Sequence, residues 1–226
     1  MFKAEAIWLS RKLATLPVDE LSPMVNIGSS TGAMRTREQF WTDQELFAPL
    51  RARGVQLVHV DRREENDGID IHADLMDDSG FEQVKAVRPR AVLCCNILEH
   101  VADPAGFARR CMTLLAPGGY LFITVPYSYP YHRDPVDTMF RPTPAEVAAL
   151  LPQATMLVGE TIDVGESYRG DVRKRPWIIL RHVIRFPFPF VSPQRWLRSM
   201  RKLYWLANNY QVTCAIFRQT GAPGAP

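Results

Sequence analysis

The chain has 226 residues, of which 46% are hydrophobic and 23% charged, so it can bury one full core and is not expected to be disordered. No apolar run approaches the roughly 20 residues that span a bilayer, and the N-terminus lacks an apolar secretion signal. We therefore expect a cytoplasmic protein. The four cysteines (Cys94, Cys95, Cys111 and Cys214) have neither zinc nor disulfide spacing, and we predict that all are buried and free, with no metal site.

The net charge of +3 hides a strong asymmetry along the chain. Residues 172–226 contain ten Lys or Arg and no Asp or Glu. The first 171 residues therefore hold 17 basic and 24 acidic residues, a formal charge of −7. A basic, aromatic section follows an acidic body, which indicates a separate function for that section.

The N-terminal residues 1–16 place apolar side chains at helical spacing and are followed by Pro17. They predict an amphipathic helix. We expect this helix to pack on the domain surface, and a lid over a substrate cleft is the alternative.

From residue 24 onward, strand-like and helical patterns alternate. We expect strands near residues 24–28, 55–60, 69–75, 91–97, 120–125, 155–162 and 211–218, a polar loop over 29–41, and helices near 42–53, 78–87, 104–115 and 143–151. This alternation predicts an α/β fold with a doubly wound, mostly parallel, seven-stranded sheet. We predict a single domain over 1–226, made of an N-terminal helix in 1–23, a core in 24–171, a basic aromatic insertion in 172–209, a closing strand in 210–218 and a flexible tail in 219–226.

Small and polar residues follow the ends of the predicted strands, where parallel sheets bind their ligands. Gly28 and Gly32 follow the first strand and allow another molecule to approach the backbone closely. Asp61 ends the second strand, where a carboxylate can accept hydrogen bonds from both hydroxyls of a ribose. The alternatives are a purely structural turn at 28–32, a solvated carboxylate at Asp61, and a dinucleotide enzyme with a damaged glycine pattern.

Several motifs together carry a family resemblance. They are Val-Asn-Ile-Gly-Ser-Ser-Thr-Gly at 25–32, Asp61, Ala-Asp-Leu at 73–75, Asn-Ile-Leu-Glu-His-Val at 96–101 and Leu-Ala-Pro-Gly-Gly-Tyr-Leu at 115–121. In order and placement they resemble class I S-adenosylmethionine-dependent methyltransferases over about residues 24–162. The resemblance implies a Rossmann-like methyltransferase fold, S-adenosylmethionine as cofactor and S-adenosylhomocysteine as product.

The resemblance also implies roles for individual residues. The amino-acid part of the cofactor would be wrapped by Gly28, Ser29 and Gly32, and its ribose would be held by Asp61. The adenine would meet Asp74 and Leu75, and the methionine portion would lie beside Asn96. Two features depart from the family pattern. Ser30 stands where the family commonly has a middle glycine, and the loop after Gly32 looks longer than usual, so that Thr31, Arg35, Thr36 and Arg37 could serve the cofactor carboxylate or the acceptor.

Methyl transfer requires mainly alignment, together with a base if the acceptor is a hydroxyl. His100 and His132 are the candidate bases because imidazole titrates near neutral pH, and Asp134 is a further candidate catalytic residue. A structural role after the fourth strand is the alternative for His100.

The segment 126–141, just past the fifth predicted strand, is rich in tyrosine, histidine, aspartate and arginine. Tyr127, Tyr131, Asp137 and Arg141 are candidate substrate residues, because aromatic faces and carboxylates suit a sugar. A proline-stiffened connecting loop is the alternative.

The basic aromatic insertion has three interpretations. It could complete the core as a helical cap, lie on an anionic membrane through residues 173–205, or bind RNA. Nucleic acid is the least favoured, because the acidic body should repel phosphate.

These observations together predict S-adenosylmethionine-dependent methyl transfer to a small-molecule or glycan acceptor. The sharper version is a lipid-linked or cell-surface sugar, met by a cytoplasmic protein that is peripheral on the inner membrane face. The alternatives are an RNA methyltransferase and a cofactor-free binding scaffold with the same fold. The oligomeric state is not predicted.

Overall fold

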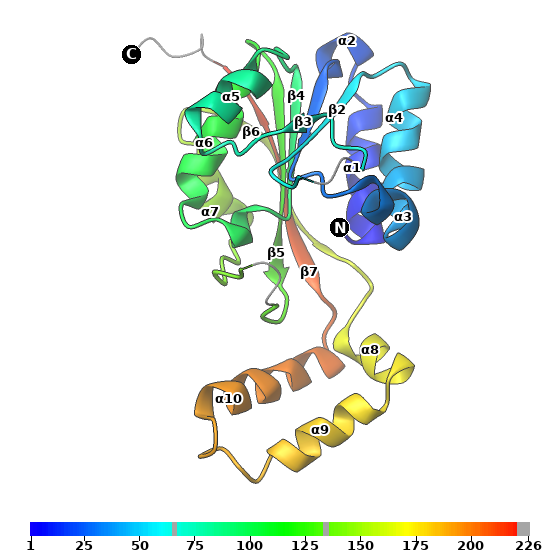
Figure 1. Cartoon of the computed structure of the whole chain (residues 1–226), viewed down its shortest axis with the longest axis vertical. Coiled ribbons are helices and arrows are strands. Elements are labelled where there is room, and N and C mark those ends of the chain that lie inside the picture. Colours follow the sequence, from blue (N-terminus) through cyan, green and yellow to red (C-terminus); the bar gives the residue numbers. More distant parts are fainter. Residues whose placement is uncertain (65–66, 133–135, 221–226) are drawn as a thin grey trace.

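The computed structural model describes residues 1–64, 67–132 and 136–220, and seven strands form one sheet in these ranges (Figure 1). The strands are β1 (Met24–Ile27), β2 (Leu57–Asp61), β3 (Ile71–His72), β4 (Ala91–Cys95), β5 (Tyr120–Ser128), β6 (Thr155–Asp163) and β7 (Gln211–Arg218). Their order in the sheet is β3-β2-β1-β4-β5-β7-β6. β1 to β5 pair in parallel, and β7 is antiparallel to both of its neighbours. The prediction of a doubly wound, mostly parallel, seven-stranded sheet is confirmed.

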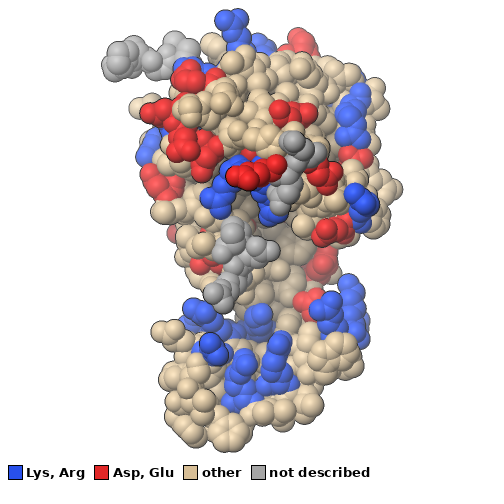
Figure 2. All heavy atoms as spheres, in the orientation of Figure 1, with Lys and Arg blue, Asp and Glu red and all other residues tan. Residues whose placement is uncertain are grey.

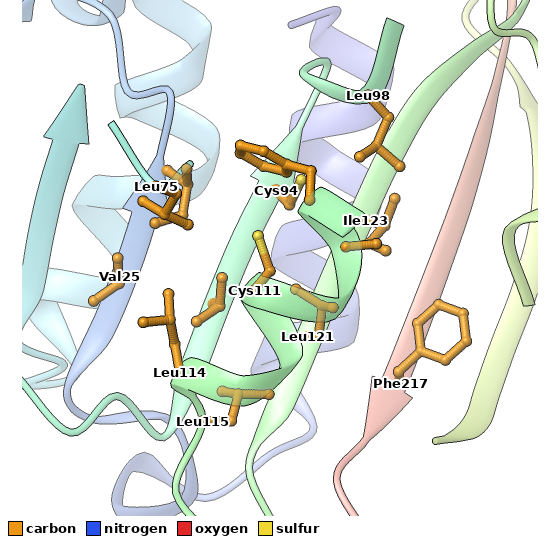
Figure 3. Packing of buried hydrophobic residues seen from close by; sticks show 14 of the residues in the cluster. Val25, Leu75, Cys94, Leu98, Cys111, Leu114, Leu115, Leu121, Ile123 and Phe217 are labelled. Atoms are coloured by element: carbon orange, nitrogen blue, oxygen red, sulfur yellow. The ribbon is translucent and has the colours of Figure 1, made fainter. Parts of the chain in front are cut away.

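Helices cover both faces of the sheet, and each face has its own hydrophobic cluster. One face carries α1 (Lys3–Ala14), α2 (Val18–Leu21), η1 (Met34–Glu38), α3 (Phe40–Thr42), η2 (Asp43–Phe47) and α4 (Ala48–Ala52). The other carries α5 (Asp78–Lys85), α6 (Pro104–Leu114) and α7 (Pro144–Ala149), and Figure 3 shows its apolar side chains packed together. Coverage on both faces explains the continuous apolar runs of the central strands.

The predicted polar loop over 29–41 is wrong, because the chain is helical from Met34 onward. The signal is hidden in the sequence because the buried side chain in η1 is a charged one, Arg35, where an apolar residue would have marked the helix. Two segments of the run are π-helical, η1 and η2, so apolar residues do not recur with the usual period of 3.6.

The N-terminal helix α1 packs on the sheet, as expected, and a buried carboxylate fixes it there. Glu5 is fully buried, and its Oε1 accepts hydrogen bonds from Asn96 Nδ2, at 2.8 Å, and from the hydroxyl of Thr124. Its Oε2 accepts the backbone N–H of Phe2 at 3.1 Å. α1 is thus joined to the ends of β4 and β5, where the predicted active site lies.

A helical hairpin (residues 168–206) leaves the sheet between β6 and β7 and lies below the body in Figure 1. It consists of α8 (Tyr168–Lys174), α9 (Trp177–Arg185), α10 (Pro193–Lys202) and η4 (Leu203–Leu206), and it begins before the predicted insertion boundary at 172. Its base joins the core, since Tyr168 is buried and Trp205 donates to Ser128 Oγ at 3.1 Å.

The far part of the hairpin does not complete the core. Trp177 is 66% exposed and Phe190 is 75% exposed. The helical-cap interpretation therefore holds only for the base, because most large apolar side chains of α9, among them Leu180 and Ile184, are exposed. Across residues 1–64, 67–132 and 136–220, no helix is both long and apolar enough to cross a membrane.

Candidate active site

The carboxyl ends of β1, β2 and β4 bring the predicted cofactor residues to one edge of the sheet. β1 lies between the other two, with Ile27 in register with Val60 on one side and with Cys94 on the other. The loops that leave these three strands are therefore neighbours, although they are far apart in sequence.

The turn after β1 requires a glycine at its first position. Gly28 has φ +61°, a left-handed conformation that is unfavourable for residues with a side chain. A Cβ there would lie 2.8 Å from Ile97 Cδ1. The backbone of the turn thus packs closely against the Ile97 side chain in the loop that follows β4.

Ser30 takes the place of a glycine in conformation as well as in sequence. It has φ +55°, which costs a non-glycine residue about 1–2 kcal/mol. Its backbone N–H donates to Asp61 Oδ2 at 2.7 Å, which helps to hold it there. Ser30 therefore preserves the shape of the loop, and the departure from the family pattern is smaller than the sequence indicates.

Arg35 does not extend toward a ligand, because its guanidinium is buried and holds the loop itself. Nη1 donates to the carbonyls of Ser29 at 2.8 Å and Ser30 at 2.6 Å, and Nη2 donates to the carbonyl of Gly68 at 2.5 Å. Burial lowers its pKa, while surrounding aspartates act in the opposite direction. The suggested role for Arg35 in binding the cofactor carboxylate is thus corrected to a structural one.

Asp61 and Asp67 also bind the loop after β1. Asp61 is buried and accepts the N–H of Ser30 on one oxygen and that of Arg63, at 3.1 Å, on the other. Asp67, which sequence reasoning missed, accepts the N–H of Ala33 at 2.8 Å, and a Cβ on Gly32 would lie 2.8 Å from its Oδ1. Gly32 thus leaves room for the loop that follows β2.

The predicted adenine residues follow β3. Asp74 Oδ1 accepts the N–H of Met76 at 2.8 Å and shapes the turn before α5. The Leu75 side chain is buried in the hydrophobic cluster (Figure 3), so only its backbone faces the edge of the sheet. Their contact with adenine stays a prediction.

Asn96 lies at the end of β4 with φ +53°, and its side chain is held by Glu5 of α1. This strained conformation, like that of Ser30, occurs at a strand end where the cofactor is expected. Glu5 is the residue that sequence reasoning missed, because a carboxylate on an amphipathic N-terminal helix resembles any solvated residue.

Glu99, His100 and His132 form a cluster beside this edge. One ligand atom from each lies within 4.8 Å of the others, a set that could hold a metal ion, whereas we predicted no metal site from the sequence. His100 Nδ1 lies within hydrogen-bond distance of the Val136 carbonyl. A carbonyl can only accept, so Nδ1 donates this hydrogen bond, and Nε2 is the ring nitrogen left for a base or ligand role.

Glu99 is 1% exposed, and burial raises the pKa of its carboxyl to about 8. Its Oε2 has no hydrogen-bond partner in the described part of the chain. A buried carboxyl of this kind is neutral near pH 7, unless a cation binds the cluster.

The remaining predicted residues lie in the segment 126–141, which we call the acceptor segment. Asp137 is buried and accepts from Arg141 Nη2 at 2.7 Å, from the N–H of Met139 at 2.8 Å and from that of His132 at 3.1 Å. Asp137 and Arg141 thus fold the segment, and any contact with substrate stays a prediction. Tyr127 is exposed and Tyr131 half-buried, whereas Asp134 lies outside the described residues.

A family model described as a methyltransferase domain matches residues 11–163. This match covers more than half of the chain, and the protein belongs to that methyltransferase domain family. The resemblance to S-adenosylmethionine-dependent methyltransferases is thereby confirmed.

Among curated proteins, the chain is similar to the ubiquinone biosynthesis O-methyltransferase of Acinetobacter baumannii (strain AYE). The two sequences are 29% identical over 142 residues, which cover 62% of this chain and 53% of that protein. The chain spans about half the length of the curated relatives it matches.

Two solved structures have a similar fold. One is the N-methyltransferase NodS of Bradyrhizobium japonicum in complex with S-adenosyl-L-homocysteine, with a TM-score of 0.51 and 14% identity, covering 97% of this chain and 86% of that one. The other is coclaurine N-methyltransferase bound to N-methylheliamine and S-adenosylhomocysteine, with a TM-score of 0.53 and 13% identity, covering 96% of this chain and 72% of that one. The Rossmann-like methyltransferase fold is therefore confirmed.

The raised pKa of Glu99 predicts a specific pH dependence of stability. Between the ordinary pKa of 4.5 and the raised value of about 8, the folded state holds a proton that the unfolded state releases. The contribution of Glu99 to the free energy of unfolding should therefore fall as the pH rises from about 5 to about 9, by an amount on the order of a few kcal/mol. His59, whose pKa is lowered by burial to about 4, acts in the opposite direction below about pH 6.5, so the contribution of Glu99 is read from the difference between wild type and a Glu99 variant. Urea unfolding at a series of pH values measures the free energy of unfolding. EDTA is present so that no cation neutralises the carboxylate.

Glu99→Gln should remove the contribution of Glu99 from the pH profile of the unfolding free energy, because the amide does not titrate. The exposed Glu82→Gln is the matched control and should leave the profile unchanged. An equal slope in wild type and Glu99→Gln would show that Glu99 is not the titrating group.

Proposed function

We propose that the protein transfers a methyl group from S-adenosylmethionine to a hydroxyl of a small-molecule acceptor, of the glycan or lipid-linked glycan class. The observation that carries this proposal is the edge shared by the Gly28 turn, Asp61 and Asn96, with His100 and His132 beside it. A similar protein with O-methyltransferase in its name supports an oxygen acceptor.

The cofactor would lie across the ends of β1, β2 and β4. Gly28 and Ser29 let the backbone approach its amino-acid part, Asp61 accepts from the ribose hydroxyls, and Asn96 borders the methionine portion. Asp61 has lone pairs left for this role after accepting from Ser30 and Arg63. Asp74 and Leu75 border the adenine.

The cofactor supplies an activated methyl group, so the chain has to orient the acceptor and remove its proton. The acceptor oxygen bonds to the methyl carbon as the methyl–sulfur bond breaks, and the hydroxyl proton passes to a histidine. The Nε2 atom of His100, 3.6 Å from Glu99 Oε1, is the first candidate to accept this proton. The ring of His132 packs edge-on against that of His100, with centroids 5.1 Å apart, and His132 is the second candidate.

The exposed apolar edge of the hairpin supports membrane contact. Trp177, Ile184, Phe186, Phe188 and Phe190 are all exposed on α9 and the turn after it. Amphipathic surfaces with aromatic and basic residues lie in the interface of anionic membranes. We include in the proposal that the hairpin places a cytoplasmic enzyme on the inner membrane face, near lipid-linked acceptors.

Binding of S-adenosylhomocysteine, measured by calorimetry, tests the cofactor assignment. Asp61→Ala should weaken binding at least tenfold, which corresponds to about 1.4 kcal/mol. Ser30→Gly should bind at least as tightly as wild type, because glycine adopts the same turn without strain. Glu82→Gln serves as the control. No binding to wild type would overturn the function and favour the cofactor-free scaffold.

Transfer of labelled methyl to fractionated lipid, glycan and RNA pools tests the acceptor class. We expect incorporation into lipid-linked or free glycan, with rates falling about 10²–10⁴-fold in whichever of His100→Asn and His132→Asn removes the base. Affinity for S-adenosylhomocysteine should be unchanged in that variant. Incorporation into RNA alone would contradict the glycan proposal.

Sedimentation with phosphatidylglycerol vesicles at low salt tests the membrane contact. Wild type should pellet, whereas a Trp177→Ser/Phe190→Ser variant should stay largely in solution, because the apolar anchor is lost. Phe40→Ser, an exposed aromatic on the body, is the control. Equal pelleting of all three proteins would count against the hairpin as the contact.

A further inference from the structure

A cavity of about 250 Å³ lies between the hairpin and the acceptor segment. It is lined mainly by cations of α9 and α10, namely Arg181, Arg185, Arg195, Arg198 and Lys202, and by Tyr131 of the acceptor segment. Figure 2 shows Lys and Arg gathered on the side of the hairpin that faces the body, across a hollow. The basic side of the hairpin therefore faces the active-site body.

The positive charge of this cavity is not neutralised by the described chain. None of the five cations forms a salt bridge with a carboxylate in residues 1–64, 67–132 and 136–220. Burial and Arg181 lower the pKa of Lys202, and Asp171 acts in the opposite direction. Like charges gathered around one cavity repel each other, and a bound anion would remove that repulsion.

The cavity is held in shape by buried hydrogen bonds. The ring of His182 on α9 lies 2.7 Å from the hydroxyl of Tyr168 on α8 and 2.7 Å from that of Ser199 on α10. Arg198 also stacks over the ring of Tyr131, with its guanidinium carbon 4.3 Å from the ring centre. The cations thus project from helices that are joined to each other and to the acceptor segment.

A second, apolar cavity of about 520 Å³ adjoins the basic one. Its lining includes Trp177, Leu180, Ile184, Phe188 and Val191. Arg181, Arg185 and Arg195 line both cavities, so the basic and apolar surfaces are continuous. A ligand with an anionic head and an apolar chain matches this pair of surfaces.

We propose that the basic cavity binds the phosphate or diphosphate group of the acceptor, and that the acceptor's apolar chain lies in the adjoining apolar cavity. Arginine and lysine are the residues that bind phosphate oxygens by charge-assisted hydrogen bonds. The basic cavity is smaller than the roughly 300–1,000 Å³ of pockets that enclose whole drug-sized ligands, so it fits a head group. Tyr131 would then place the attached sugar toward the His100 and His132 cluster. The inference rests on the proposed function and narrows its substrate class to a lipid-linked phosphate or diphosphate.

Three probes separate the contributions of phosphate and chain: inorganic diphosphate, farnesyl diphosphate and farnesol. Tryptophan fluorescence, with Trp177 in the apolar cavity, and calorimetry measure their binding to the full chain. We expect farnesyl diphosphate to bind at least tenfold tighter than either of the other two, and its binding to weaken with salt. Equal binding of inorganic diphosphate and farnesyl diphosphate would overturn the lipid part, leaving soluble phosphate compounds as the source.

Substitution of the cavity cations provides the decisive comparison. Arg198→Gln/Lys202→Gln should weaken binding of farnesyl diphosphate at least tenfold. Arg201→Gln lies on the same helix but outside both cavities, and it should bind like wild type. Equal losses in both variants, or no binding to wild type, would overturn the proposal. Binding of a single-stranded RNA oligonucleotide that depends on Arg198 and Lys202, without binding of farnesyl diphosphate, would assign the cluster to nucleic acid.

The cofactor site is measured separately in the same proteins. Asp61→Ala should lose affinity for S-adenosylhomocysteine and keep affinity for farnesyl diphosphate, whereas Arg198→Gln/Lys202→Gln should do the reverse. Failure of the phosphate site is therefore distinguishable from failure of the methyltransferase function.

Discussion

The hydrogen bonds of the buried Arg35 guanidinium are the interaction on which the cofactor edge depends, that is, the edge formed by the carboxyl ends of β1, β2 and β4, where we propose that the cofactor binds. The guanidinium donates to carbonyls in the loop after β1 and to the Gly68 carbonyl in the loop after β2. Asp61 joins the same two loops through the N–H of Ser30. Neighbouring parallel strands bring the two loops together, and these polar contacts, with that of Asp67 to the N–H of Ala33, fix their shape. A preformed edge spares the ordering cost that a flexible loop would add to ligand binding.

Much of the fold was predictable because its signals are local. Apolar runs marked all seven strands, and the helix predicted near 104–115 is α6, at whose start the Asp103 side chain accepts the N–H of Gly106. The same holds for Gly28, Asp61 and Asn96, whose placement follows from lying at strand ends. Glu5 and Arg35 were not predictable as buried residues, since their partners are backbone groups and side chains from distant segments, and no local pattern records such contacts.

The proposed chemistry divides between two environments. The cofactor edge is lined by backbone and by hydrogen-bonded carboxylates, whereas the cluster beside it contains a nearly unexposed glutamic acid and two histidines. A neutral Glu99 carries no charge of its own beside His100, whose Nε2 lies 3.6 Å from its Oε1. A bound cation would instead ionise Glu99 and draw the acceptor oxygen to the metal. The same three residues thus support either route to an activated hydroxyl.

The hairpin connects two strands that are already paired to each other. β6 and β7 are antiparallel, with Asp163 in register with Gln211, so both ends of the hairpin leave the sheet at one point. The part of the hairpin beyond its core-bound base can therefore vary in length and content without changing how the strands pair. If the hairpin binds the acceptor as proposed, its exchange during evolution would change the acceptor and leave the strand ends that meet the methyl donor intact.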